Sequence, residues 1–141
     1  MEKPKFKNTI ASLYPVDTEH KTPVVYYNVI KGHHLAKLYL KYILAAIDLN
    51  IKKLLIDIEV IRDDNVSVFN YNTSMLTNTF RNNIITTEND KLNTASFTSG
   101  PFEFEISDNE THFYSVIMKL KKSDGTLLDT SKTWLMTRPD K

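Results

Sequence analysis

The sequence predicts an α+β fold: a predominantly antiparallel β meander with one main helix, at about residues 33–49, packed on a face of the sheet. Strand-like runs near the C-terminus, at residues 101–107, 112–122 and 127–138, predict the meander. The turn S-D-G-T at residues 123–126 joins the last two runs. Asp-Gly between alternating runs is a strong hairpin signal, because a type I′ turn needs positive φ at both central residues. An all-β, immunoglobulin-like sandwich is the alternative fold.

The segment 33–49 is the one candidate helix. Ala, Leu and Lys outnumber β-branched residues in it, and its apolar residues recur at helical spacing. These residues are Leu35, Leu38, Tyr39, Tyr42, Ile43, Ala46 and Ile47. The polar stripe between them is narrow, which is typical of a helix that is mostly enclosed. A strand is the competing interpretation, because alternate residues from Ala36 to Leu44 are also apolar.

The other segments predict strands and loops. Residues 22–30 are β-branched and aromatic, which indicates a first strand. Alternation returns at residues 51–60 and again at 66–71. Residues 72–100 are rich in Asn, Thr and Ser, so we expect short strands and exposed loops there, or a lid. Residues 1–22 are polar and read as an N-terminal arm.

Composition narrows the range of partners. At 141 residues, the chain is expected to form a single domain, residues 1–141, with no stretch long enough to span a membrane. A net charge of +1 gives no electrostatic reason to expect nucleic-acid binding. No apolar stretch follows the N-terminal lysines, so no signal peptide is expected. We therefore expect a cytoplasmic protein or a part of a larger assembly.

The sequence offers no catalytic constellation. It contains no Cys, which excludes disulfides, thiolate catalysis and Cys-ligated zinc. Its one adjacent histidine pair, His33 and His34, would point about 100° apart on a helix, which does not suit a shared metal. No phosphate-binding glycine loop is present. Catalytic residues therefore stay unassigned, enzymatic activity is not predicted, and no metal or cofactor is expected.

The last hairpin predicts an apolar surface. With the turn centred on Asp124-Gly125, Ser115 lies opposite Trp134, and Phe113 lies opposite Met136. Ile117 falls on the same face. Phe113, Ile117, Trp134 and Met136 would then form a second hydrophobic cluster, opposite the face that carries Tyr114, Val116, Met118 and Leu120. Either another part of the chain, such as the 33–49 helix, or a partner would cover this cluster.

Two patches resemble hot-dog acyl thioesterases. Gly32-His33 followed by Y-L-K-Y at residues 39–42 is similar to the start of the central helix in that family, and D-G-T-L-L followed by T-W-L-M is similar to its last hairpin. The resemblance implies binding of an acyl thioester carried by coenzyme A or an acyl carrier protein. Val29 stands where the family has an acidic residue, so acyl binding or a structural dimer is implied more strongly than hydrolysis.

Three functions follow from these observations. The first is a non-catalytic β-rich interaction or assembly module, of a phage, secretion or surface-assembly type, which binds another protein or itself. The second is the hot-dog-like protein that binds or hydrolyses acyl thioesters. The third is a cone-shaped α+β domain that holds a small apolar ligand between helix and sheet, with Tyr39 and Tyr42 among the lining residues.

Overall fold

The computed structural model describes residues 7–17, 23–24, 26–29, 32, 34–78, 84–86, 91–106 and 109–139. These residues form strands and no α-helix, and none of them belongs to a helix that could cross a membrane. The strands are β1 (Thr9–Val16), β2 (Tyr26–Val29), β3 (Leu35–Asp48), β4 (Lys53–Arg62), β5 (Ser67–Leu76), β6 (Ile84–Thr86), β7 (Lys91–Glu105), β8 (His112–Lys122) and β9 (Leu127–Pro139).

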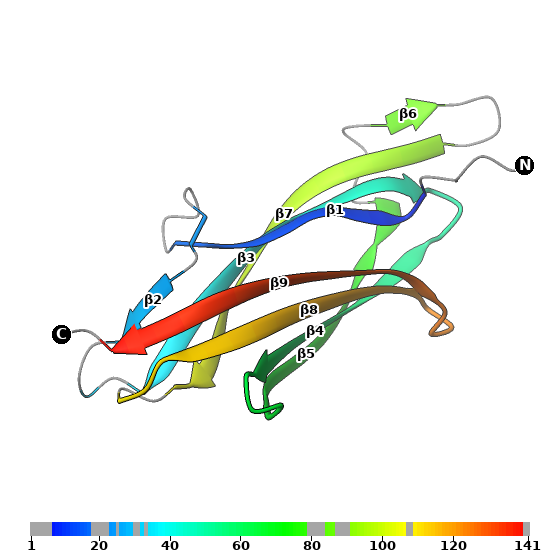
Figure 1. The fold of residues 1–141 in the computed structure, drawn as a ribbon. Coiled ribbons are helices and arrows are strands. Elements are labelled where there is room, and N and C mark those ends of the chain that lie inside the picture. The colour runs from blue at the N-terminus through cyan, green and yellow to red at the C-terminus, as the bar shows by residue number, and fades with distance from the viewer. Residues whose placement is uncertain are drawn as a thin grey trace, which may run out of the picture.

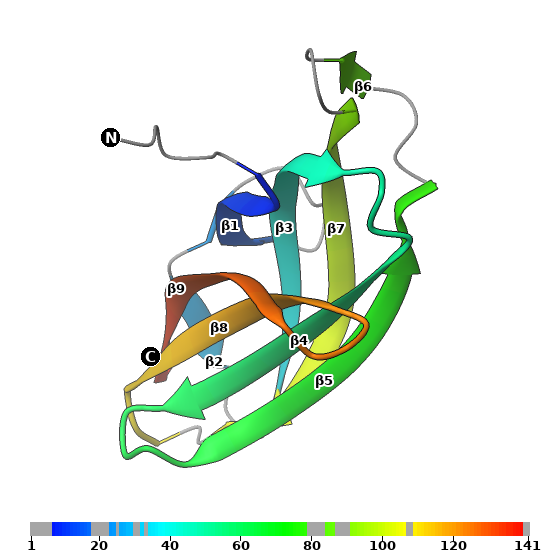
Figure 2. The ribbon, with the colours of Figure 1, turned by 90° about the vertical axis from the view of Figure 1, so that its right-hand side faces the viewer.

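The strands form two sheets that pack face to face (Figures 1 and 2). One sheet has four strands in the order β1-β3-β7-β6, and the other has five in the order β2-β9-β8-β4-β5. Neighbouring strands are antiparallel, except that β2 runs parallel to β9. This all-β arrangement of two layers is closer to the alternative fold than to the main prediction.

The core lies between the two sheets and is built from alternate residues of the long strands. The four-stranded sheet contributes residues such as Leu40, Leu44 and Phe104, and the five-stranded sheet contributes Ile56 and Met118. All five side chains are buried, with exposed fractions of 3% or less. Because side chains of a strand alternate between its two faces, residues with the other parity lie on the outer faces of the sheets.

The predicted helix at residues 33–49 is wrong, because this segment forms β3. Two features explain the helical spacing: both faces of β3 carry apolar residues, and a β-bulge interrupts the alternation. The residue pairs between β3 and β7 shift between Leu44 and Ile47, where Ala46 adopts a φ of +54°. The bulge moves the buried set from Leu44 to Ile47, a step of three residues, which mimics the period of a helix. The outer face of β3 also carries apolar residues that are only partly exposed, which is why the sequence predicted a mostly enclosed helix.

Absence of this helix also overturns two functional predictions. A hot-dog fold needs a central helix against its sheet, and the described part of the chain has none. The cone-shaped α+β domain fails for the same reason. The acyl-thioester and helix-and-sheet ligand proposals are therefore not pursued further.

The predicted meander is correct for two hairpins, β4–β5 and β8–β9, but not for the run at residues 101–107. β8 and β9 form the expected hairpin, but β7 pairs with β3 in the other sheet. Alternation shows which residues of β7 are buried and does not show which strand pairs with it. Phe102 and Phe104 do meet Tyr114 and its buried neighbours, but across the core and not along one sheet.

The β8–β9 turn differs from the predicted two-residue loop. Gly125 N–H donates to the Lys122 carbonyl at 2.9 Å, and Lys122 N–H donates to the Thr126 carbonyl at 2.9 Å, so three residues form the loop. Gly125 has a φ of +91°, as the third residue of such a loop requires. A bulge between the pairs Leu120↔Asp129 and Lys121↔Leu127 then restores the predicted register.

Two further segments differ from expectation. Residues 9–16, expected within a polar arm, form β1, where Ile10 and Val16 are buried at 7% and 5% exposure. Between residues 72 and 100, the described part carries the end of β5, the three-residue β6 and most of β7, so the strands there are longer than expected. Residues 79–83 and 87–90 lie outside the described residues. The expected first strand at residues 22–30 appears in part as β2.

Candidate interaction surface

The outer face of the five-stranded sheet carries the predicted apolar cluster. The predicted register is confirmed: Phe113 pairs with Met136, Ser115 with Trp134, and Ile117 with Lys132. Tyr26 of β2 joins the cluster because it pairs with Met136 in the parallel ladder. We call this set the outer aromatic face; its residues are Tyr26, Phe113, Ile117, Trp134 and Met136.

Aromatic rings of this face are open to solvent. The exposed fractions are 49% for Tyr26, 50% for Phe113 and 53% for Trp134. Phe113 and Trp134 pack on each other, with ring centroids 6.2 Å apart. Leu135, next to Trp134 in sequence, is only 2% exposed because it points into the core. The strand therefore keeps one face in the core while its other face displays large apolar rings.

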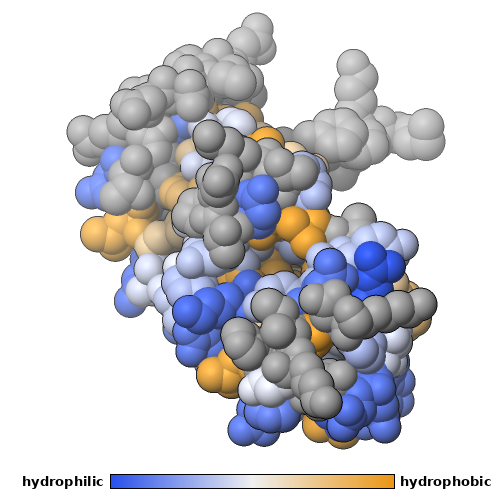
Figure 3. All heavy atoms as spheres, turned by 90° about the vertical axis from the view of Figure 1, so that its left-hand side faces the viewer, coloured by the Kyte–Doolittle hydropathy of each residue, from blue (hydrophilic) through white to orange (hydrophobic). Residues whose placement is uncertain are grey.

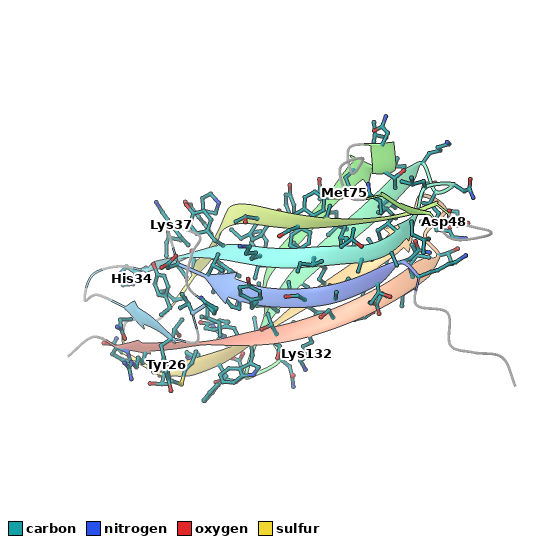
Figure 4. The ribbon with its side chains drawn as sticks, turned by 90° about the horizontal axis from the view of Figure 1, so that it is seen from above. Tyr26, His34, Lys37, Asp48, Met75 and Lys132 are labelled. Atoms are coloured by element: carbon teal, nitrogen blue, oxygen red, sulfur yellow. The ribbon has the colours of Figure 1, made fainter. Side chains whose placement is uncertain are left out.

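Polar groups surround the outer aromatic face. The Arg138 guanidinium lies 4.6 Å from the centre of the Tyr26 ring, a cation–π distance, and its Nε donates a hydrogen bond of 2.9 Å to Asn28 Oδ1. Lys132 projects from β9 farther along the same side of the molecule (Figure 4). Apolar rings within a polar border are the usual anatomy of a protein-binding surface.

Hydrogen bonds of the His112 and Asp63 side chains hold the start of β8, where Phe113 lies. His112 Nδ1 is 2.9 Å from Asp63 Oδ1, and its Nε2 is 3.0 Å from Glu110 Oε2. The second carboxylate oxygen of Asp63 accepts a 3.1 Å hydrogen bond from Phe113 N–H. The hydrogen bond with His112 lowers the pKa of Asp63 below its ordinary value. The β4–β5 turn thereby holds one end of the outer aromatic face in place.

Farther along the same sheet, the outer face becomes polar. Lys121 Nζ lies 2.7 Å from Asp57 Oδ2, and residues of β4, β5 and β8 line a shallow hollow there. The lining residues are Asp57, Glu59, Asn70, Asn72, Ile117, Lys119 and Lys121. The charges of Lys121 and Asp57 neutralise each other, and most of the lining residues are polar. We therefore regard this region as the solvent-facing part of the sheet.

The other predicted site residues do not come together. Tyr42 points into the core with 2% exposure, and its hydroxyl is 3.1 Å from Ser99 Oγ. Burial raises its pKa. Tyr39 lies on the outer face of the same strand, so the two tyrosines do not line one cavity. His34 lies at the end of the molecule near Lys37 (Figure 4), and His33 falls outside the described residues.

Tyr26 is the member of the face that sequence reasoning missed. Its strand was expected, but no local pattern indicates that a four-residue strand pairs in parallel with the last strand of the chain.

In the part of the chain that the structure describes, no three His, Asp or Glu side chains are grouped to hold a metal ion. Around β2 and the end of β9, hydrophobic residues reach the surface in separate patches among polar ones (Figure 3).

No protein-family model and no curated protein sequence matches this chain. Solved structures do match its fold. β-Glucuronidase 2 of Bacteroides uniformis matches 86% of this chain at a TM-score of 0.56 and 16% identity. A glycosyl hydrolase family 2 member from Bacteroides cellulosilyticus matches 90% of this chain at a TM-score of 0.54 and 10% identity. The CooA pilin subunit from enterotoxigenic Escherichia coli gives a TM-score of 0.39 at 6% identity, which carries no weight for fold or function.

The chain spans only a small part of the two glycosyl hydrolase structures, 12% of the first and 15% of the second. At these identities, the likeness concerns the fold and no activity. A β-rich domain with this arrangement of strands therefore also occurs as one portion of much longer proteins.

Proposed function

We propose that this chain is a non-catalytic β-sandwich module that binds another protein through the outer aromatic face. One observation carries the proposal: Phe113 and Trp134 are half exposed and packed on each other, on a sheet whose opposite face already closes the core. Isolated exposed apolar residues are normal in proteins, whereas a contiguous group of them marks an interaction surface.

The chemistry of the face supports a protein partner. Trp, Tyr, Met and Arg are the residue types enriched in protein interfaces, and Trp, Tyr and Arg most often dominate the binding energy. All four occur within this face or at its border, as Trp134, Tyr26, Met136 and Arg138. Lys132 and Arg138 border the face on β9, and Asp63 and Glu110 border it beside the start of β8. Because charges of both signs surround the rings, the rings would supply most of the affinity.

The rigidity of the face also supports this function. Its residues lie on β2, β8 and β9, where main-chain pairing fixes the direction of each side chain. The Asp63–His112 contact holds the start of β8. Binding therefore costs little ordering of the backbone, and affinity depends mostly on the rings that become buried.

Photo-cross-linking in the cells that make the protein tests this proposal. A benzophenone amino acid replaces Phe113 in one variant and Leu127 in the control. Leu127 is 53% exposed and lies on the same hairpin but outside the face. We expect a discrete protein adduct from position 113 that is lost when Trp134→Ala is added, and none from position 127. No adduct at 113, or the same adducts at both positions, would contradict the proposal.

A further inference from the structure

The β5 strand forms an unprotected edge of the five-stranded sheet. It pairs with β4 on one side, and Figure 2 shows it as the outermost strand of its sheet. Within the described residues, no strand pairs with its other side. In an antiparallel edge strand, every second residue directs both its N–H and its C=O outward. Such a row of polar groups is a template for another strand.

The sequence of β5 lacks the usual protection of an edge. Natural proteins block edges with charged residues, proline, bulges or very short strands. Over ten residues, β5 reads S-V-F-N-Y-N-T-S-M-L, with no charged residue, no Pro and no Gly. Its one irregularity, a register shift opposite Val60 and Ile61, lies near its start.

The other described edges are protected. β2 has four residues and β6 has three. β1 contains Pro15 and a bulge, and the Asp129 carboxylate accepts a 2.7 Å hydrogen bond from Ile10 N–H. The open side of β7 carries Pro101, which has no N–H to donate, in a bulge beside Glu103. The part of β9 that β2 does not cover carries Asp129 and Lys132. β5 is therefore the one long described edge that lacks both charge and proline.

An aromatic hollow adjoins this edge. Phe69 and Tyr71 of β5 face Phe102 of β7, with ring centroids 5.4 Å and 5.2 Å from the Phe102 ring. A hollow of about 450 Å³ opens between the two strands, and Tyr71 is 40% exposed. Ser99, Gly100 and Pro101 complete its lining, and none of the lining residues is charged.

We infer that β5 pairs antiparallel with β5 of a second copy of this chain and joins the two five-stranded sheets. The absence of charge supports a copy as the occupant, because self-pairing sets no like charges opposite each other. A two-fold axis also requires a self-complementary patch, which an antiparallel strand pair provides. Asn side chains carry both donor and acceptor groups, so Asn70 and Asn72 can bond across the axis.

Side-chain parity restricts the register of this pair. Residues directly opposite each other in an antiparallel pair point to the same face. A register centred on Tyr71 satisfies this condition, with Asn70 opposite Asn72 and Phe69 opposite Thr73. It uses the edge from Phe69 to Thr73, because the register shift before Phe69 puts Ser67 on the opposite face from Met75. Each Tyr71 ring then meets its copy beside the aromatic hollow, which the pair covers.

Sedimentation velocity over a range of concentrations tests the inference first. We expect the wild-type chain to dimerise. Tyr71→Lys should weaken dimerisation at least tenfold, because the proposed register sets the two lysines directly opposite each other. Ser123→Lys adds the same charge on the exposed β8–β9 turn and should have no effect. A wild-type chain that stays monomeric, or a dimer that Tyr71→Lys leaves intact, would overturn the inference.

Disulfide cross-linking then tests the register. The chain has no cysteine, so in each single variant the introduced cysteine is the only residue that can form a disulfide. Tyr71→Cys should form a cross-linked dimer, since the two Cα atoms would lie about 5 Å apart. Thr73→Cys should not, because its own copy would lie about 13 Å farther along the strand. Cross-linking by Thr73→Cys, or none by Tyr71→Cys, would reject this pairing. Trp134→Ala should leave the dimer unchanged, which separates this inference from the proposed function.

Discussion

Trp134 and Leu135 are adjacent in β9, but one lies on the proposed binding surface and the other in the core. Leu135 is 2% exposed in the core, whereas Trp134 is 53% exposed on the outer face. Alternation along a strand places them on opposite sides. The same alternation separates Phe113, which is 50% exposed, from Tyr114, which is 1% exposed and whose pKa is raised by burial.

Gly100 is required by its backbone conformation. Its φ is +131°, and a Cβ there would lie 2.6 Å from the carbonyl oxygen of Leu38. We expect Gly100→Ala to lower the free energy of unfolding by more than about 2 kcal/mol, through strain and this contact together. Gly125→Ala is the control, because its φ of +91° is also positive but nothing lies within 4 Å of an added Cβ. Its expected cost is about 1 kcal/mol.

Urea denaturation measures both glycine variants. Equal losses for Gly100→Ala and Gly125→Ala would show that the contact with Leu38 contributes nothing.

The Arg62–Asp64 pair at the β4–β5 turn predicts a pH effect. Hydrogen bonds of 2.8 and 2.7 Å from Arg62 to the two carboxylate oxygens of Asp64 lower the pKa of that residue to about 2. A lowered pKa in the folded chain contributes stability above the ordinary pKa of Asp, about 3.9, and the contribution is lost as pH falls through 2. NMR titration of the carboxylate should give a midpoint near 2, and Arg62→Gln should raise it. A midpoint near 4 in the wild-type chain would show that the pair does not form.

At the scale of elements, the β8–β9 hairpin could be predicted well from the sequence. Its alternating runs specified the faces and the pairs Phe113↔Met136 and Ser115↔Trp134. The turn itself was predicted with one residue too few, and the bulge that follows compensated for the error. The apolar cluster was therefore predictable, because it depends only on local alternation and one turn.

β3 could not be assigned correctly from its sequence. Both faces of the strand are largely apolar, and the bulge at Ala46 changes the parity of the buried residues. A continuous apolar run with a three-residue step is compatible with a buried helix or a buried strand. Neighbouring strands decide between them: β1 and β7 satisfy the backbone of β3 on both sides, and this pairing is not visible locally.

The β9 strand supplies a direct comparison of its two faces. We expect Trp134→Ala to lower the free energy of unfolding by at most about 1 kcal/mol, because the ring is half exposed and loses few contacts. Leu135→Ala removes a buried side chain and should cost about 2–4 kcal/mol. Urea denaturation with matched m-values is the measurement. A larger loss from Trp134→Ala than from Leu135→Ala would place Trp134 in the core and remove the basis of the interaction surface.

At the scale of the whole molecule, the two sheets have different roles in this account. The four-stranded sheet closes the core, whereas the five-stranded sheet closes the core and carries both proposed binding regions. The outer aromatic face lies on β2, β8 and β9, and the unprotected edge lies on β5. Only β4 lies between the two regions in the order of the strands. This arrangement suits a module within an assembly.

Pairing between distant strands set the limit of sequence reasoning for the whole fold. β4 pairs with β8 across more than fifty residues of chain, and nothing local in either strand specifies the other. The parallel addition of β2 to β9, which brings Tyr26 to the face, is non-local in the same way. The β5 edge became visible only when the order of the strands was known.

The fluorescence of Trp134 in the purified chain tests the central claim most directly, because it is the only tryptophan of the sequence. The measurement is acrylamide quenching, at a concentration where sedimentation shows a monomer. We expect emission close to that of tryptophan in water, quenching near that of the unfolded chain, and little change when urea unfolds the protein. Blue-shifted emission that resists quenching until the chain unfolds would show that the protein covers this face itself, and would contradict the proposed function.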